Sequence, residues 1–216
     1  MVDADRCISC GAIIPEGRLV CPVCQKRVEG MYIPDELPEE TQIRIGRYYG
    51  YVNPYIPYNV SEWLVDNGFF SAPASTHYHG AYDGGLFDHS FQVAWELNAL
   101  TRSNNLRWQD PRSPYIIGLL HDLCKIDQYR KLDEPDEKGR LYAWNDTPIK
   151  GHGEKSVILL SQLMELTEEE AECIRWHMGA FDEKENWTGF TDAIHKFPNV
   201  LWTHQADMIA AHIREV

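Results

Sequence analysis

The chain has 216 residues, of which 44% are hydrophobic and 25% charged, and this composition is typical of a soluble globular protein. The formal net charge is −13. Residues 1–30 carry four basic and four acidic side chains, so residues 31–216 hold the whole acidic excess. Binding of duplex or long polyanions depends on neutralising phosphates with Lys and Arg, so this acidity favours a small or short single-stranded substrate.

No stretch of the chain approaches the ~20 apolar residues that a membrane span requires. The first residues also lack the basic start and apolar segment of a secretory signal peptide. We therefore expect a cytoplasmic protein with no membrane partner.

Two Cys-x2-Cys pairs lie within residues 1–30, at Cys7, Cys10, Cys21 and Cys24. Each pair can wrap one edge of a tetrahedral ion, so the spacing predicts a zinc ribbon that holds one structural zinc. Such a short unit cannot build a core, and the metal would hold it together. The alternative is two disulfides in a secreted domain. The balanced charge of the ribbon favours a protein partner or a dimer contact over a nucleic-acid clamp.

Residues 31–60 contain several prolines and an acidic run, a composition that predicts a linker followed by irregular structure. Its tyrosines indicate that part of the segment packs on the main domain.

From residue 61 onward, apolar residues recur at helical spacing, and we expect an all-α helical bundle over residues 61–216. Thr167 and Glu170 form a capping-box pattern at one helix start. The expected helices cover residues 62–67, 86–100, 114–127, 154–166, 168–177 and 200–213, with a hairpin insertion or long loop over residues 131–144.

His121 and Asp122 follow directly on the apolar run of residues 115–120. Polar groups at the end of a buried segment cost free energy unless something pairs with them. Imidazole together with a carboxylate suits a divalent first-row metal ion, so this pair predicts a metal site.

Further metal-grade side chains recur at helix ends or on apolar stripes of the same bundle: His89, His152, His177 and Asp207. A single histidine on an apolar face is usually a core residue with its own partner, and His204 is best interpreted in that way. Taken together, however, the others would each need a separate buried partner, whereas one shared metal site satisfies all of them.

This ordered set, with Gly-Leu-Phe-Asp-His-Ser around His89 and Leu-Leu-His-Asp-Leu-Cys-Lys around His121, resembles the HD-domain superfamily of metal-dependent phosphohydrolases over roughly residues 60–216. It resembles the six-ligand version, which binds two metals. The resemblance implies the ligands His89, His121, Asp122, His152, His177 and Asp207.

The resemblance further implies that Asp122 bridges the two ions. His89, His121 and Asp207 would complete one ion, and the other two histidines the second. A bridging hydroxide with a lowered pKa would be the nucleophile. Histidine-rich ligation favours iron or manganese over magnesium.

Four cations lie beside these ligands in the sequence. Lys125 would share a helical face with His121 and Asp122 and is expected to orient the bridging carboxylate or to contact a substrate phosphate. Lys150, Lys155 and Arg175 flank ligand histidines and predict a local phosphate-binding group, with ordinary surface charge as the alternative.

The segment from His77 to Gly85 resembles the loop that precedes the first ligand in HD-domain 3′→5′ exoribonucleases. His77 would then contact substrate and His79 would act as an acid for the leaving group. Those nucleases carry an N-terminal nucleic-acid-binding barrel where this chain has the cysteine motif, so a polynucleotide substrate does not follow.

The primary hypothesis is a phosphohydrolase that cleaves a phosphomonoester or phosphodiester of a nucleotide or short single-stranded nucleic acid. The same ligand order occurs in myo-inositol oxygenase and related enzymes, so a di-iron oxygenase is the first alternative. The second is a non-catalytic interaction module. Oxygen uptake would separate the oxygenase from the hydrolase.

Overall fold

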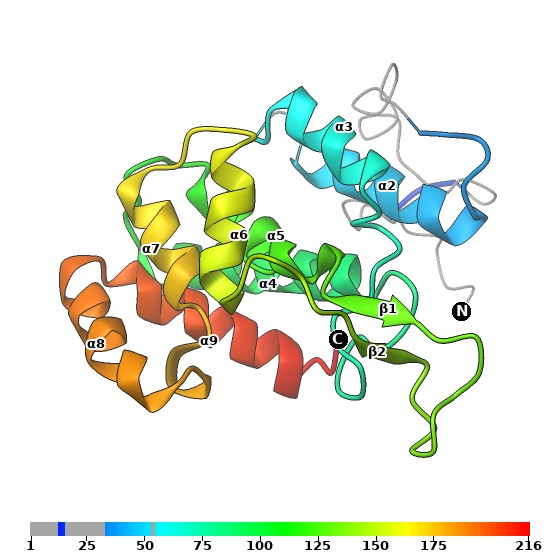
Figure 1. The fold of residues 1–216 in the computed structure, drawn as a ribbon. Helices are drawn as coiled ribbons and strands as arrows, with labels where there is room; N and C mark the ends of the chain where they lie inside the picture. The colour runs from blue at the N-terminus through cyan, green and yellow to red at the C-terminus, as the bar shows by residue number, and fades with distance from the viewer. Residues whose placement is uncertain (1–12, 16–32, 53–54) are drawn as a thin grey trace.

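The computed structural model describes residues 13–15, 33–52 and 55–216, and it is an all-α bundle with one two-stranded hairpin (Figure 1). The predicted zinc ribbon lies almost wholly outside these residues. In chain order the elements are α2 (Glu39–Val52), α3 (Tyr58–Asp66), α4 (Gly85–Asn104), α5 (Ser113–Leu120), η1 (Leu123–Ile126), β1 (Tyr129–Lys131), β2 (Tyr142–Trp144), α6 (His152–Ser161), α7 (Glu168–Trp176), η2 (Gly179–Phe181), η3 (Lys184–Asn186), α8 (Trp187–Lys196) and α9 (Asn199–His212).

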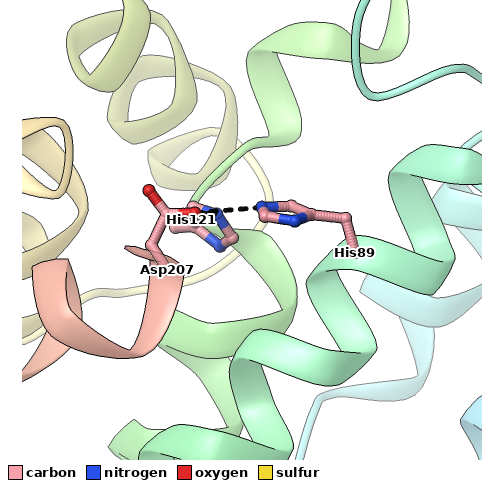
Figure 2. A group of neighbouring side chains, drawn as sticks. All are labelled: His89, His121 and Asp207. Atoms are coloured by element: carbon pink, nitrogen blue, oxygen red, sulfur yellow. Dashed lines mark ion pairs between the residues drawn. The ribbon is translucent and has the colours of Figure 1, made fainter. Parts of the chain in front are cut away.

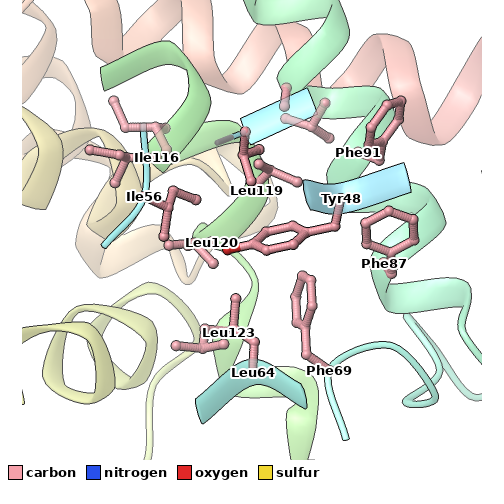
Figure 3. Packing of buried hydrophobic residues seen from close by; sticks show 14 of the residues in the cluster. Tyr48, Ile56, Leu64, Phe69, Phe87, Phe91, Ile116, Leu119, Leu120 and Leu123 are labelled. Atoms are coloured by element: carbon pink, nitrogen blue, oxygen red, sulfur yellow. The ribbon is translucent and has the colours of Figure 1, made fainter. Parts of the chain in front are cut away.

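Helix α4 is the central element of the bundle and packs against α5 and α9. The close approach of α4 and α5 depends on Gly118, because a Cβ there would lie 2.3 Å from the Cα of Ala94. Around this contact, large apolar side chains from several helices interdigitate (Figure 3). The bundle therefore holds the ends of α4, α5 and α9 in a fixed relation.

The prediction of irregular structure before residue 61 is wrong for residues 39–52, which form α2. Its tyrosines Tyr48 and Tyr49 are fully buried in the core, which confirms that part of this segment packs on the bundle. In Figure 1, α2 and α3 lie on the opposite side of α4 and α5 from α9. The prolines misled the prediction because Pro38 and Pro57 lie just before helices, where proline is tolerated.

The helix expected over residues 114–127 is two elements. Helix α5 ends at Leu120, and the chain leaves helical geometry at Asp122 (φ −101°, ψ 21°) before the 3-10 turn η1. The backbone N–H of Lys125 donates to the carbonyl of Asp122 at 2.9 Å. Side chains three residues apart eclipse in a 3-10 turn, so Asp122 and Lys125 are aligned by this turn rather than by an α-helix.

The predicted hairpin is confirmed: β1 and β2 pair antiparallel, with Tyr129 opposite Trp144. The capping box at Thr167 is also present, with both of its hydrogen bonds formed. The expected helix over residues 154–166 begins earlier, at His152, and ends at Ser161, and helix α8 was not predicted. Within the described ranges, none of the helices combines the length and apolar character that a bilayer crossing needs.

Candidate metal centre

Helix ends and one helix face bring the six predicted ligands together in the bundle. His89 lies in the first turn of α4, and His121 and Asp122 follow α5. His152 is the first residue of α6, His177 follows α7, and Asp207 lies within α9. Imidazole and carboxylate groups that are far apart in the sequence are therefore collected at one point, as the metal-site prediction requires.

The Asp122 carboxylate lies at the middle of this cluster, and its two oxygens face different histidines. Oδ2 is 3.4 Å from His121 Nε2 and 3.6 Å from His89 Nε2. Oδ1 is 2.7 Å from His152 Nε2 and 3.4 Å from His177 Nε2. The Asp122 carboxylate therefore lies between His89 and His121 on one side and His152 and His177 on the other.

Asp207 completes the group on the Oδ2 side. Its Oδ1 lies 3.1 Å from His89 Nε2 and 3.9 Å from His121 Nε2. Figure 2 shows His89 and Asp207 pointing toward each other from α4 and α9, beside His121. These three side chains offer ligand atoms that all lie within 4.8 Å of one another, close enough to share one ion.

Three of the histidines are oriented by backbone carbonyls. Nδ1 of His121 and Nδ1 of His177 donate to the carbonyls of Gly118 and Ile174, at 3.0 and 2.7 Å. Nδ1 of His89 donates to the Val216 carbonyl at 2.9 Å. A carbonyl can only accept, so each Nδ1 carries the proton and each Nε2 presents a lone pair, as in metal-binding histidines.

The Nε2 atoms of these histidines are buried and have no hydrogen-bond partner among the described residues. Leaving several buried polar atoms unpaired in one place costs free energy. A metal ion satisfies them, and the accompanying carboxylates supply the negative charge that a divalent ion needs. The donor set therefore fits divalent metal ions.

His152 differs from the other histidines because its side chain is about a quarter exposed, at 24%. Burial lowers its pKa, and the nearby Asp122 charge opposes that shift only in part. Its Nδ1 lies 3.7 Å from Cys124 Sγ. Burial and the Asp122 charge raise the pKa of the Cys124 thiol to about 12, so Cys124 is protonated at neutral pH and behaves as a small apolar residue.

Lys125 is buried against the central carboxylate, with Nζ 2.7 Å from Asp122 Oδ2. Burial alone would lower the pKa of Lys125, but the Asp122 charge holds it above its ordinary value. Burial likewise would raise the pKa of Asp122, and the Lys125 ammonium together with His121 keeps it well below its usual range. Both groups are therefore charged at neutral pH, and the ion pair lies on the Oδ2 side of the Asp122 carboxylate.

The cluster opens into a cavity of about 850 Å³, which is lined by His79, Asp122, Lys125, His152 and Asp207 among the predicted residues. The His79 ring lies 4.9 Å from that of His89. Burial, His89 and Lys125 lower the pKa of His79 to about 4, so its imidazole is uncharged at neutral pH. In that state it offers substrate a neutral hydrogen-bonding group.

The four residues predicted only to contact substrate or its phosphate do not line this cavity. His77 is exposed and its ring packs against Tyr78, with centroids 5.3 Å apart. Lys150, Lys155 and Arg175 each form an ion pair with a carboxylate, so the structure does not bring them together as a phosphate-binding group. Their partners are Asp146 for Lys150, Asp127 for Lys155, and Glu154 and Asp182 for Arg175.

Several lining residues were not identified from the sequence. Tyr129 and Trp144 come from the hairpin, and Phe181 comes from η2. The C-terminal segment also contributes Glu215 to the lining, and Arg214 of the same segment pairs with Glu96 at 2.8 Å. The aromatic residues of the hairpin were the available signal, whereas the C-terminal contact left none.

His204 belongs to the surroundings of the cluster rather than to its ligands. Its Nδ1 donates to the backbone carbonyl of His177 at 2.7 Å. This contact agrees with the interpretation of His204 as a residue with its own partner rather than a ligand.

The family model of the HD domain matches residues 86–211, and the chain belongs to this family. The match runs from α4 into α9 and spans all six predicted ligands, whereas the cysteine motif, α2 and α3 lie outside it. No curated protein and no solved structure shows significant similarity to the chain. HD domains bind divalent metals and are characteristic of a superfamily of metal-dependent phosphohydrolases.

Proposed function

We propose that the chain is a phosphohydrolase that cleaves a phosphate ester of a nucleotide or of a short single-stranded nucleic acid. The observation that supports this most is the buried Asp122 carboxylate, whose two oxygens each face a pair of histidine Nε2 atoms at the floor of an open cavity. We further propose that this cluster binds two divalent ions, iron or manganese, through His89, His121, Asp122, His152, His177 and Asp207.

Divalent ions in such a site lower the pKa of a water molecule and neutralise charge on a phosphoryl group. The protein residues position and stabilise this centre. Asp122 holds the two halves of the ligand set together, and Lys125 fixes its Oδ2 atom. His79 lines the cavity as a neutral imidazole and offers a hydrogen bond to the substrate phosphate or leaving group.

The cysteine motif is proposed to bind one structural zinc, and its balanced charge favours a protein partner or a second copy of the chain as its contact. The cytoplasmic location remains part of this proposal, and the acidic remainder favours a small substrate.

The direct test is phosphate release by the purified protein, loaded with manganese or iron, from nucleotides, short RNAs and generic phosphodiesters. Asp122→Ala should abolish turnover and lower the content of manganese or iron while the zinc content is kept. Asp110→Ala is the matched control, because Asp110 forms an ion pair with Arg112 and does not line the cavity. Metal retained by Asp122→Ala would contradict the site, and oxygen uptake in place of phosphate release would contradict the hydrolase.

A further inference from the structure

We propose that the mouth of this cavity selects a substrate that carries one phosphate group on a planar ring body, as in a nucleoside monophosphate, and disfavours di- and triphosphates and longer strands. Trp144, Tyr78 and Phe181 would form the ring-binding surface. This inference rests on the proposed phosphohydrolase function and specifies its substrate class.

Three large aromatic side chains lie at the cavity and remain largely exposed: Trp144 at 62%, Phe181 at 63% and Tyr78 at 77%. They come from separate segments, namely β2, η2 and the loop before α4. Exposed aromatic groups gathered at a concave site are typical of ligand contacts rather than of scattered surface residues. Planar bases stack on such side chains regardless of their sequence.

Two neighbouring rings support this surface. Tyr129 packs edge-on against Trp144, with centroids 5.9 Å apart. His212 stacks beside Phe181, with centroids 6.2 Å apart and an interplanar angle of 24°. Tyr129 and His212 line the same cavity, so the aromatic surface extends inward toward the metal centre.

The charges of the lining limit the substrate to few phosphates. Among the described residues that line the cavity, Lys125 is the only lysine or arginine, and its ammonium is paired with Asp122. Glu215 adds negative charge to the lining outside the proposed ligand set. Lys131 of the adjacent strand β1 is paired with Asp83 and does not line the cavity. One phosphate can bind at the metal centre, but a second or third would find no free lysine or arginine among the described lining residues and would meet the Glu215 carboxylate.

The experiment compares kcat/KM for AMP, ATP, the dinucleotide pApA and ribose 5-phosphate, which has the phosphate but lacks the base. We expect AMP to exceed ribose 5-phosphate by about tenfold or more, because stacking of one base contributes on that order to binding. AMP should also exceed ATP and pApA, because their additional phosphates find no free cation in the lining. Trp144→Ala should raise KM for AMP about tenfold with little change in kcat, and Trp144→Phe should restore most of the loss.

Trp95→Ala is the matched control, because Trp95 is 46% exposed and does not line the cavity. It should leave all four substrates unaffected. Equal use of AMP and ATP or pApA would overturn the charge limit. An equal loss for AMP and ribose 5-phosphate in Trp144→Ala would overturn the stacking role.

Calorimetric binding of adenosine 5′-monophosphorothioate and its triphosphate counterpart separates this inference from the proposed function, because it does not depend on turnover. If the monophosphate analogue binds more tightly and this preference is lost in Trp144→Ala, the result supports substrate selection at the cavity mouth. If no ester is cleaved in that case, the hydrolase proposal alone fails. No preference, or binding unchanged in Trp144→Ala, refutes the inference even where phosphate release is observed.

Discussion

Replacing Lys125 by methionine removes the ammonium beside Asp122 and keeps a side chain of similar length. The Lys125 side chain is 9% exposed and that of Asp122 is 2% exposed, so the variant leaves a buried carboxylate without its cation. Breaking a buried pair in this way typically costs about 3–5 kcal/mol. We expect the free energy of unfolding to fall by about 3 kcal/mol, at the lower end of that range, because His152 Nε2 remains 2.7 Å from the other carboxylate oxygen.

The size of this loss should depend on metal. Divalent ions bound by the cluster supply positive charge to the same carboxylate, so the penalty should fall by at least half when manganese is saturating. For a protein of this size, ~3 kcal/mol corresponds to a decrease in Tm of about 6–12 °C. Thermal unfolding of the variant and wild type, each measured with manganese and after identical mild chelation, gives both values.

Lys155→Met is the control because Lys155 is also a buried lysine paired with an aspartate. Its side chain is 4% exposed, but its partner Asp127 is 51% exposed and can be solvated, and neither residue lines the cavity. The loss of stability in Lys155→Met should be smaller than that in Lys125→Met, and it should be equal with and without manganese. If the penalty of Lys125→Met were also independent of manganese, Asp122 would not face a bound ion and the metal-centre assignment would be wrong.

Three further changes test the fold and the support of the site. Gly118→Ala forces a Cβ into the backbone of α4 and should lower stability by about 2 kcal/mol or more, whereas Gly46→Ala in α2, with no atom within 4 Å of the added Cβ, should raise the Tm slightly. Thr167→Ala removes the capping box of α7 and should cost about 1 kcal/mol in denaturant unfolding; no change would show that the cap is dispensable. Arg214→Ala frees the segment whose carbonyl orients His89 and should weaken manganese binding about tenfold by metal titration, and unchanged affinity would remove that segment from the site.

The clustering of the six proposed ligands could be predicted because each is a distinctive residue type placed at a helix end or on an apolar stripe, and their order along the chain is informative. Such positions depend on local periodicity, which a sequence displays directly. The cations were harder to predict because their role depends on which acids lie nearby in space. Arg175, for example, lies two residues before the proposed ligand His177 in the sequence, yet it binds Glu154 and Asp182.

Helix α2 was missed for a related reason. Proline-rich composition is correctly associated with helix boundaries, but it was extended to the whole of residues 31–60, where α2 lies between the prolines. The buried residues of α2, including Ile45 and Tyr48, recur at helical spacing. The prediction gave more weight to the prolines on either side than to this spacing.

Chemistry and selectivity therefore have different origins in this chain. The proposed metal ligands lie in or directly after helices that form the core, so the packing that stabilises the bundle also fixes their geometry. The exposed rings Trp144, Phe181 and Tyr78 lie on the hairpin and on connecting segments, which can vary without disturbing that core. Substitutions at these rings should consequently change which phosphate esters are bound while leaving metal binding and stability nearly unaltered, whereas substitutions at the ligands should affect metal binding for every substrate alike.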